Sequence, residues 1–493
     1  MNEQGESLQK SGGEDDFVQA IARQEDQYSQ WYNDVVLKAQ LADYSPVRGC
    51  MVIRPYGYAL WESIQGELDR RFKATGVMNA YFPLFIPESL FQKEAEHVEG
   101  FAPEVPWVTH AGEEVLGERL AVRPTSEIII GTMYARWVQS YRDLPLLINQ
   151  WCNVVRWERR TTPFLRTTEF LWQEGHTAHR DEADARQRTL MMLEVYRSFL
   201  EEHLAIPVLA GRKSLLEKFA GAVDTYTVEA LMGDGRALQA GTSHYLGDGF
   251  AKVLGIEYLD EDGKHKPVHQ TSWGMSTRVI GGLIMVHGDT RGLVLPPRVA
   301  PYQAVIVPIA PARVREKVLA AAENVRERLA AAGVRVQLDD RAEHSPGWKF
   351  NEWELRGVPL RLELGPRDLD AGQLVMVRRD TGAKVSIPDS ELETAVTNDL
   401  AVMQDEMLAR ARQTLADHTF PVTTMDELKS LAADRRGFAA AGWCGAAGCE
   451  TAVKESTGAT IRCIPINGEP AAGSTCIHCG EPALHQVYLA RAY

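Results

Sequence analysis

The residues best suited to chemistry lie in one stretch, NQWCNVVRWERRTTPFLRTTEFLWQEGHTAH, which spans residues 149–179. Two runs with a residue period of two flank a loop rich in arginine, which predicts strand, loop and strand. If the two runs pair as an antiparallel hairpin, one surface carries Arg156, Glu158, Trp172, Glu174 and His176. Arginine binds phosphate or carboxylate through two parallel donors, whereas a carboxylate can hold an ammonium group. The surface suits a small zwitterion and a polyphosphate, and an ordinary solvated hairpin is the alternative.

A second segment, RPTSE, combines a strand end with a predicted helix start. Thr125 or Ser126 would be the N-cap, because short hydroxyl side chains accept hydrogen bonds from the first free backbone N–H groups. Glu127 would lie in the first turn, where the helix dipole favours an acid. These local roles explain all three residues without any ligand.

A third segment, RALQAGTSHYLG, places glycines beside Gln239 and His244. Glycine allows close backbone approach to a ligand, although a plain turn-rich connection is equally consistent with this composition. Strict alternation would put Gln239 and Thr242 on opposite faces of a strand. A ligand shared by these two residues therefore requires a bulge near Gly241.

The composition is typical of a soluble globular chain, with 493 residues, of which 45% are hydrophobic and 24% are charged. No apolar run reaches the roughly 18 residues of a membrane span, and the N-terminus lacks the apolar core of a signal peptide. We therefore predict a cytoplasmic protein with no membrane contact. The polar, glycine-rich residues 1–15 are predicted to be disordered. The net charge of −14 leaves room for one structured RNA at a local basic patch such as residues 151–180.

The order of predicted elements divides the chain into three domains. Strands and helices alternate after residue 301, which predicts an α/β domain over residues 301–400. A first domain is expected over residues 16–300 and a last one over residues 401–493. Within the first domain we predict a helix over Gly211–Tyr226.

Four cysteines near the C-terminus have the spacing of a metal site. They are Cys444, Cys449, Cys476 and Cys479. Two close pairs of thiolates can complete a tetrahedral zinc site, whereas reduced cysteines without metal are the alternative. Cys463 could compete as a ligand. His176 and His179 are weaker metal candidates, because residues three apart on a strand face opposite sides.

Several of these motifs resemble those of one enzyme family. Arg-x-Glu, a basic loop, and then an arginine and an aromatic-acidic strand resemble motif 2 of class II aminoacyl-tRNA synthetases. RWE followed by FLRTTEFLWQEGHTAH is similar to prolyl-tRNA synthetases of the archaeal and eukaryotic type. Residues 49–87 resemble motif 1, and TSWGMSTRVIGGLIMVHGDTRGLVLPPRVAP resembles motif 3. The resemblance runs in collinear order from about Tyr28 to Tyr493.

The resemblance implies both a fold and a reaction. The fold would be an α+β catalytic domain built on an antiparallel sheet, followed by an α/β anticodon-binding domain and a small α+β zinc-binding C-terminal domain. The reaction would join L-proline to ATP, with Mg²⁺, and transfer the prolyl group to the 3′ end of tRNA(Pro). Neither step needs an enzyme nucleophile, because positioning and cations suffice. The resemblance also implies a homodimer built on motif 1.

The same resemblance implies roles for individual residues. The catalytic arginines would be Arg156 and Arg298. ATP contacts would come from Arg156, Glu158, Arg166, Thr167, Gln239, Thr242, Ser276, Arg278 and Arg298. Proline contacts would come from Thr125, Glu127, Arg156, Trp172, Glu174, His176 and His244. Weaker candidates for anticodon contacts are Lys349, Arg356, Glu363 and Arg378. The zinc held by Cys444, Cys449, Cys476 and Cys479 would be structural.

Two other interpretations stay open at this stage. One is another class IIa synthetase, threonyl or histidyl, against which the pocket residues Trp172 and His176 argue. The other is a catalytically inactive, synthetase-like RNA-binding or regulatory protein. Such a protein would be expected to have lost Arg156, Glu158 or Arg298, all of which are present. The sequence lacks a GxxxxGK[ST] loop, so any ATP site has a different architecture from a P-loop.

The interval between motifs 2 and 3 is too short for a large editing insertion, which leads to a prediction about specificity. Alanine is smaller than proline and cysteine is similar in size, and a pocket gains only about 1–3 kcal/mol per methylene. We expect amino-acid-dependent exchange of pyrophosphate into ATP with cysteine or alanine as well as with proline. A proline-to-cysteine rate ratio above about 10⁵ would contradict this expectation.

Overall fold

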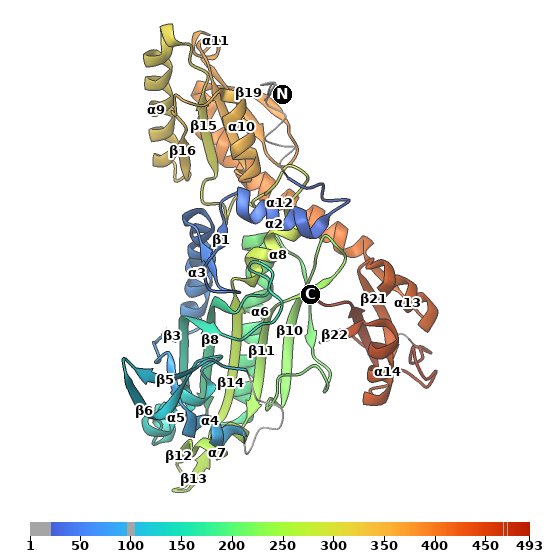
Figure 1. The fold of residues 1–493 in the computed structure, drawn as a ribbon. Coiled ribbons are helices and arrows are strands. Elements are labelled where there is room, and N and C mark those ends of the chain that lie inside the picture. Colours follow the sequence, from blue (N-terminus) through green and yellow to red (C-terminus); the bar gives the residue numbers. More distant parts are fainter. Residues whose placement is uncertain (1–20, 96–103, 467, 471) are drawn as a thin grey trace, which may run out of the picture. The chain divides into compact units, whose positions relative to one another are not determined.

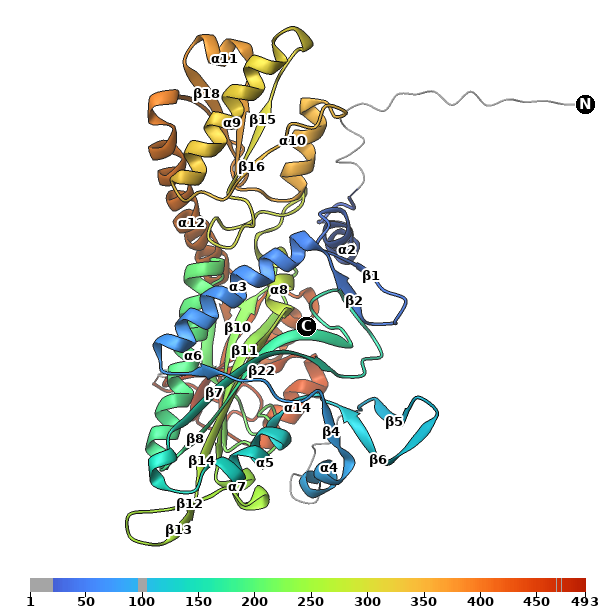
Figure 2. The same cartoon turned by 90° about the vertical axis from the view of Figure 1, so that its left-hand side faces the viewer.

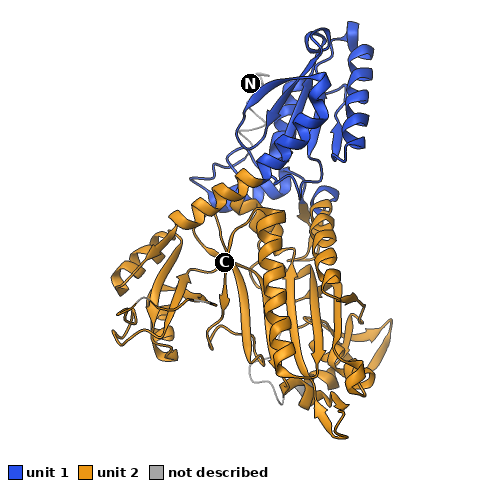
Figure 3. Ribbon diagram, turned by 180° about the vertical axis from the view of Figure 1, so that it is seen from behind, with its two compact units in different colours: residues 1–41, 54–57, 287–404 blue, residues 42–53, 58–286, 405–493 orange. Residues whose placement is uncertain are grey.

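A computed structural model describes residues 21–95, 104–466, 468–470 and 472–493. The predicted disorder of residues 1–15 lies outside the described residues. The chain forms two compact units (Figure 3): unit 1 comprises residues 1–41, 54–57 and 287–404, and unit 2 comprises residues 42–53, 58–286 and 405–493. Among the helices of the described residues, none is both long enough and apolar enough to cross a membrane.

Unit 2 is built on an 11-stranded sheet (Figure 1). In spatial order its strands are β20 (Thr419–Pro421), β21 (Phe438–Trp443), β23 (His485–Ala490), β22 (Thr460–Pro465), β9 (Val208–Arg212), β10 (Asp224–Leu231), β11 (Ala237–Gly247), β14 (His269–Ser276), β8 (Glu169–His179), β7 (Leu146–Val155) and β3 (Met78–Asn79). The β20–β21 and β3–β7 pairs are parallel and the other pairs are antiparallel. The predicted antiparallel sheet is therefore confirmed.

Helices and small sheets surround these strands. The helices are α3 (Pro55–Ala74), α4 (Glu88–Ala95), α5 (Glu127–Trp137), η1 (Tyr141–Asp143), α6 (Glu182–Leu204), α7 (Gly249–Leu254), α8 (Arg278–His287), α13 (Met425–Asp434) and α14 (Ala447–Thr457). The small sheets pair β1 (Ala42–Tyr44) with β2 (Met51–Ile53), β12 (Glu257–Leu259) with β13 (His265–Pro267), and β4 (Phe85–Pro87) and β5 (Trp107–Ala111) with β6 (Glu114–Val122). Figure 2 shows α3 and α6 on one face of the large sheet.

The predicted hairpin is the pair β7–β8, in which Gln150 lies opposite Glu174 and Cys152 lies opposite Trp172. Alternate residues of the hairpin and its neighbours point toward the helices, where Phe72 of α3 contacts Trp151 and Trp273. The intervening residues face the opposite side of the sheet. This division follows from the period of two along each strand.

The bulge required near Gly241 is present. Along β10 and β11, Val228 pairs with Gly241 and Glu229 pairs with Gln239, so Ala240 is the extra residue. A bulge of this kind shifts the alternation by one position. Gln239 and Thr242 consequently line the same cavity.

Residues 211–226 correct one prediction, because they do not form a helix. β9 ends at Arg212 and β10 begins at Asp224, with a loop over residues 213–223 between them. The expected helical stripe fails because Leu215 and Leu216 are exposed, at 74% and 52%, rather than buried in a core.

Unit 1 contains a 5-stranded sheet in the order β16 (Val336–Leu338), β15 (Ala304–Pro308), β17 (Leu360–Leu364), β18 (Gln373–Arg378) and β19 (Lys384–Pro388). Its helices are α2 (Tyr28–Lys38), η2 (Ala312–Val314), α9 (Arg315–Ala331), α10 (Pro346–Leu355), α11 (Pro366–Asp370), η3 (Asp389–Glu391) and the first part of α12 (Leu392–Asp417). Ile306, Leu329 and Leu362 are fully buried in its core. The alternating strands and helices agree with the predicted α/β pattern.

A substitution of Gly175 on β8 tests how closely the sheet packs against its helices. A Cβ atom at this position would lie 2.0 Å from a ring atom of Trp273, which is buried and cannot easily move. We expect Gly175→Ala to lower the free energy of unfolding by about 1–3 kcal/mol, measured by urea denaturation. The control is Gly117→Ala on β6, where no heavy atom lies within 4 Å of the added Cβ. Equal urea midpoints for the two variants would contradict the expectation.

Candidate active site

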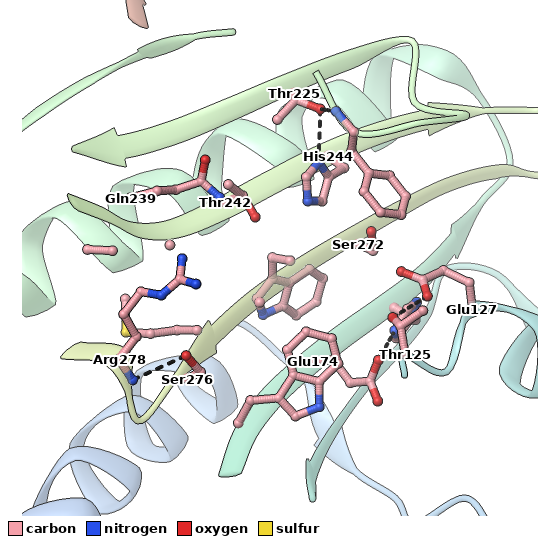
Figure 4. A pocket seen from close by; sticks show the side chains of 18 of the residues that line it. Thr125, Glu127, Glu174, Thr225, Gln239, Thr242, His244, Ser272, Ser276 and Arg278 are labelled. Atoms are coloured by element: carbon pink, nitrogen blue, oxygen red, sulfur yellow. Dashed lines mark hydrogen bonds and ion pairs between the residues drawn. The ribbon is translucent and has the colours of Figure 1, made fainter. Parts of the chain in front are cut away.

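A cavity of about 230 Å³ opens on the face of the large sheet opposite α3 and α6 (Figure 4). Eleven of its lining residues were predicted as site residues. They are Thr125, Glu127, Arg156, Trp172, Glu174, His176, Gln239, Thr242, His244, Ser276 and Arg278. These residues come from five elements and their flanking loops, and the strand register brings them together.

Two arginines give one end of the cavity its positive charge. Arg156 directly follows β7, and its Nε donates to the carbonyl of Pro124 at 3.0 Å. Arg278 opens α8, and its Nε donates to the carbonyl of Leu165 at 3.0 Å. Burial lowers the pKa of both guanidinium groups, and repulsion from Arg156 lowers that of Arg278 further. An anion bound here would relieve both effects.

The Arg156 guanidinium also lies against aromatic rings. Its central carbon is 5.2 Å from the ring centroid of Trp172 and 5.5 Å from that of Phe170. Such cation–π contacts hold a guanidinium in place without using its hydrogen-bond donors. The remaining donors are available to a ligand.

Figure 4 shows Thr125 and Glu127 at the other end of the cavity, away from Arg278. The Thr125 hydroxyl donates to the Glu127 carboxylate. Glu127 is the first residue of α5, as predicted, and Ser126 is its N-cap. The Ser126 hydroxyl makes no capping bond, however, because it donates to Glu174. Glu127 therefore supplies a carboxylate where a ligand ammonium group could bind.

Glu174 is fully buried and engaged with protein groups. Its carboxylate accepts from the Ser126 hydroxyl, from Gln150 Nε2 at 2.7 Å and from the Ser126 backbone N–H at 3.1 Å. It also lies 3.1 Å from His176 Nε2. Burial alone would raise the pKa of Glu174, but these hydrogen bonds and the His176 charge hold it below its ordinary value. The arrangement favours Glu174 as the partner of His176, with Glu127 left to meet a ligand.

A row of polar residues crosses four neighbouring strands. In register across the sheet stand Thr225, His244, Ser272 and His176. Thr225 Oγ1 and His244 Nδ1 form a hydrogen bond of 3.0 Å. Ser272 Oγ is buried and has no hydrogen-bond partner among the described residues. This hydroxyl can bind a ligand without breaking any internal contact.

The two histidines of this row differ in charge. Burial alone would lower the pKa of His176, but the hydrogen bond to Glu174 and the nearby Glu127 raise it. His244 has no acidic neighbour of this kind. Burial, with repulsion from His176, lowers the pKa of His244 to about 3. His176 is thus the histidine that holds a proton more readily, whereas His244 is neutral.

Four predicted ATP contacts do not line the cavity. Glu158 and Arg166 form an ion pair with each other at 2.8 Å. Thr167 donates its hydroxyl to the carbonyl of Glu169 at 2.8 Å. Arg298 is exposed, belongs to unit 1, and has a backbone N–H that donates to Gln404. The predicted roles of these residues stay predictions, whereas Ser276 and Arg278 do line the cavity.

Sequence reasoning missed three residues that matter for the shape of the cavity. Phe219 and Thr225 lay within the segment wrongly predicted as a helix, so nothing indicated that they face a ligand. Ser272 could have been found, because it shares the face of Ser276 along a strand with a period of two.

The four anticodon candidates are engaged in ion pairs within unit 1. Lys349 is buried and donates to the carbonyl of Asp339 at 2.9 Å. The other pairs are Arg356 with Glu352, Glu363 with Arg361 and Lys384, and Arg378 with Asp380 and Asp399. Their predicted role in anticodon contact stays a prediction, and these pairs account for them as structural residues.

The four cysteines of the C-terminal region meet at one point. The Sγ atoms of Cys444, Cys449, Cys476 and Cys479 all lie within 4.8 Å of one another. The Cys444–Cys449 and Cys444–Cys479 sulfur distances are 3.6 and 3.8 Å. Tetrahedral zinc with Zn–S bonds of about 2.3 Å requires sulfur separations of about 3.8 Å, so the residues fit this ion. Cys463 is buried in β22 and is not part of the cluster.

Comparisons with known proteins agree with this geometry. Three family descriptions match: "tRNA synthetase class II core domain (G, H, P, S and T)" over residues 109–287, "Anticodon binding domain" over residues 303–399, and "Prolyl-tRNA synthetase, C-terminal" over residues 425–493. The chain is 58% identical to a proline–tRNA ligase of Symbiobacterium thermophilum, across 97% of this chain and 99% of the relative. It is 57% identical to a proline–tRNA ligase of Natranaerobius thermophilus, across 98% and 100% of the two chains.

The neutral state of His244 predicts a specific dependence of stability on pH. Because its pKa in the folded protein is about 3, it binds no proton between pH 3 and 6.5, where the unfolded chain does. The free energy of unfolding should fall as the pH decreases below 6.5, by up to about 1.4 kcal/mol per pH unit from this group. We expect a shallower fall for His244→Gln in urea denaturation series at pH 4.5–7. Parallel curves for the two proteins would contradict this account.

Proposed function

The chain belongs to the proline–tRNA ligase family, and we propose that its cavity activates L-proline with ATP and passes the prolyl group to tRNA(Pro). The arrangement of charge in the cavity carries the proposal for the site. The guanidinium groups of Arg156 and Arg278 line the cavity and lie close enough to repel each other, and the Glu127 carboxylate lies at the end away from Arg278. A zwitterionic amino acid joined to a nucleoside phosphate needs this distribution.

We assign the arginine end to ATP, which enters with Mg²⁺ as substrate. Arg156 and Arg278 would hold the α-phosphate and the adenine end, with Gln239, Thr242 and Ser276 beside them. Neither step of the reaction needs an enzyme nucleophile. In the first step the proline carboxylate attacks the α-phosphorus while the bond to pyrophosphate breaks. Fixed cations in a largely buried site stabilise the charge that develops on the phosphate oxygens.

We assign the opposite end to proline. The ring nitrogen of proline is a secondary ammonium with two N–H donors. Glu127 and Thr125 can accept hydrogen bonds from these donors. Trp172 and Phe219 would cover the apolar ring, and neutral His244 would close the pocket beside them. Placing the carboxylate toward Arg156 brings it to the phosphate in a reactive orientation.

The remainder of the chain supports the second step, in which tRNA is charged. We propose a catalytic domain over residues 16–300, an anticodon-binding domain over 301–400 and a C-terminal domain over 401–493 whose four cysteines hold structural zinc. The family match over residues 303–399 supports contact between the second domain and tRNA.

We also propose a homodimer in the cytoplasm. Exposed apolar residues near motif 1 support the dimer, among them Tyr44, Val52 and Tyr58, which are 61%, 50% and 43% exposed. Apolar residues gathered on a surface are typical of a protein interface. No feature of the described residues favours the inactive or the threonyl and histidyl alternatives.

Arg156 provides the test of the proposed function. We expect proline-dependent exchange of pyrophosphate into ATP in the wild type, and a loss of about 10²-fold or more in Arg156→Ala, because a fixed cation on the transferring phosphate is removed. The matched control is Arg326→Ala, which removes a half-buried arginine of α9 that pairs with Glu323 and should leave exchange unchanged. Absence of exchange with proline in folded wild-type protein would overturn the proposal.

A further inference from the structure

The loop over residues 213–223 forms one wall of the cavity. Glu217, Lys218 and Phe219 line it directly. The ring of Phe219 lies 4.8 Å from that of His244, and the backbone N–H of Phe219 donates to Thr225 Oγ1 at 3.0 Å. The same hydroxyl is bonded to His244, so the position of the loop and that of the imidazole are linked.

The other side of this loop contacts the C-terminal helix α14. The Ser214 hydroxyl donates to Glu450 Oε1, and both residues are buried, at 2% and 4% exposure. Lys454, one turn further along α14, lies 3.3 Å from the Glu217 carboxylate. The second contact is solvent-exposed and contributes little, whereas a buried hydrogen bond to a carboxylate is strong.

A buried ion cluster fixes the start of the loop to the same C-terminal region. Lys213 Nζ lies 2.7 Å from Glu229 Oε1, and Arg462 of β22 binds the other oxygen of Glu229 at 2.8 Å. Glu229 is itself the partner of Gln239 in the β10–β11 register. The C-terminal region therefore contacts the cavity wall at several points, and Ser214–Glu450 is the buried contact nearest along the chain to Phe219.

Glu450 directly follows Cys449 of the cysteine cluster, so the cluster lies at the end of α14 that meets the loop. We propose that Glu450 is a positioning residue for the amino acid pocket, acting through Ser214 and the loop on Phe219 and His244. This inference rests on the proposed function of the cavity. It gives the C-terminal domain a role in amino acid binding in addition to stability.

Because of where the loop lies, the proposal predicts different effects on the KM values for the two substrates. Phe219 and His244 lie at the proline end, whereas Arg156 and Arg278 make no hydrogen bond to the loop among the described residues. Loss of the Ser214–Glu450 bond should therefore raise KM for proline and leave KM for ATP almost unchanged. A residue that only stabilises the fold would change neither KM value in the folded fraction.

Pyrophosphate exchange on the full-length protein tests this signature with four variants. Ser214→Ala and Glu450→Ala should each raise KM for proline about tenfold, the equivalent of one buried hydrogen bond to a charged group. Glu450→Gln should stay close to wild type, because its amide oxygen still accepts from the Ser214 hydroxyl. Glu455→Ala, an exposed position on the same helix, should match wild type.

Metal content and thermal stability, measured on the same samples, separate positioning from loss of the cysteine site. We expect Ser214→Ala to retain the metal content of the wild type, since it leaves α14 intact. An unchanged KM for proline in Ser214→Ala, or an equal rise in both KM values, would overturn the proposal. Absence of proline exchange in the wild type would instead show that the proposed function itself is wrong.

Discussion

Two positive charges that line one cavity are the constraint on which the rest of the site depends. Desolvation lowers the pKa of both Arg156 and Arg278, and repulsion from Arg156 lowers the pKa of Arg278 further. A guanidinium has five N–H donors, and a backbone carbonyl takes one Nε–H in each case. An anion that enters the cavity can accept hydrogen bonds from the other donors. A phosphate that bridges the two arginines would restore the balance of charge.

The large sheet makes this arrangement rigid. Strand register sets which residues share a face, and register in a sheet with one face against helices is strongly fixed. The bulge at Ala240 then brings Gln239 onto the face that already carries Thr242 and His244. On the opposite face, Trp273 packs against Phe72 of α3, and this contact holds the strands in position. Ligand selectivity thus depends on packing outside the cavity as well as inside it.

Much of the fold and of the cavity could be predicted, because the relevant patterns are local. The hairpin β7–β8 has a clear period of two, and the bulge followed from asking how Gln239 and Thr242 could share a ligand. What failed depended on contacts between distant segments. Ser126 and Gln150 engage Glu174, and nothing in their spacing indicates that. The loop over residues 213–223 has apolar residues at helical spacing, but α14 and the cavity, rather than a helical core, determine its conformation.

The central claim is the polarity of the cavity, with phosphate at the arginine end and proline at the histidine end. A crystal structure with a non-hydrolysable prolyl-adenylate analogue, whose sulfamoyl group replaces the phosphate, tests it most directly. We predict the sulfamoyl oxygens within hydrogen-bond distance of Arg156, the adenine beside Arg278, and the prolyl nitrogen at Glu127 and Thr125. An analogue bound in the reverse direction, or with its sulfamoyl group away from both arginines, would contradict the account.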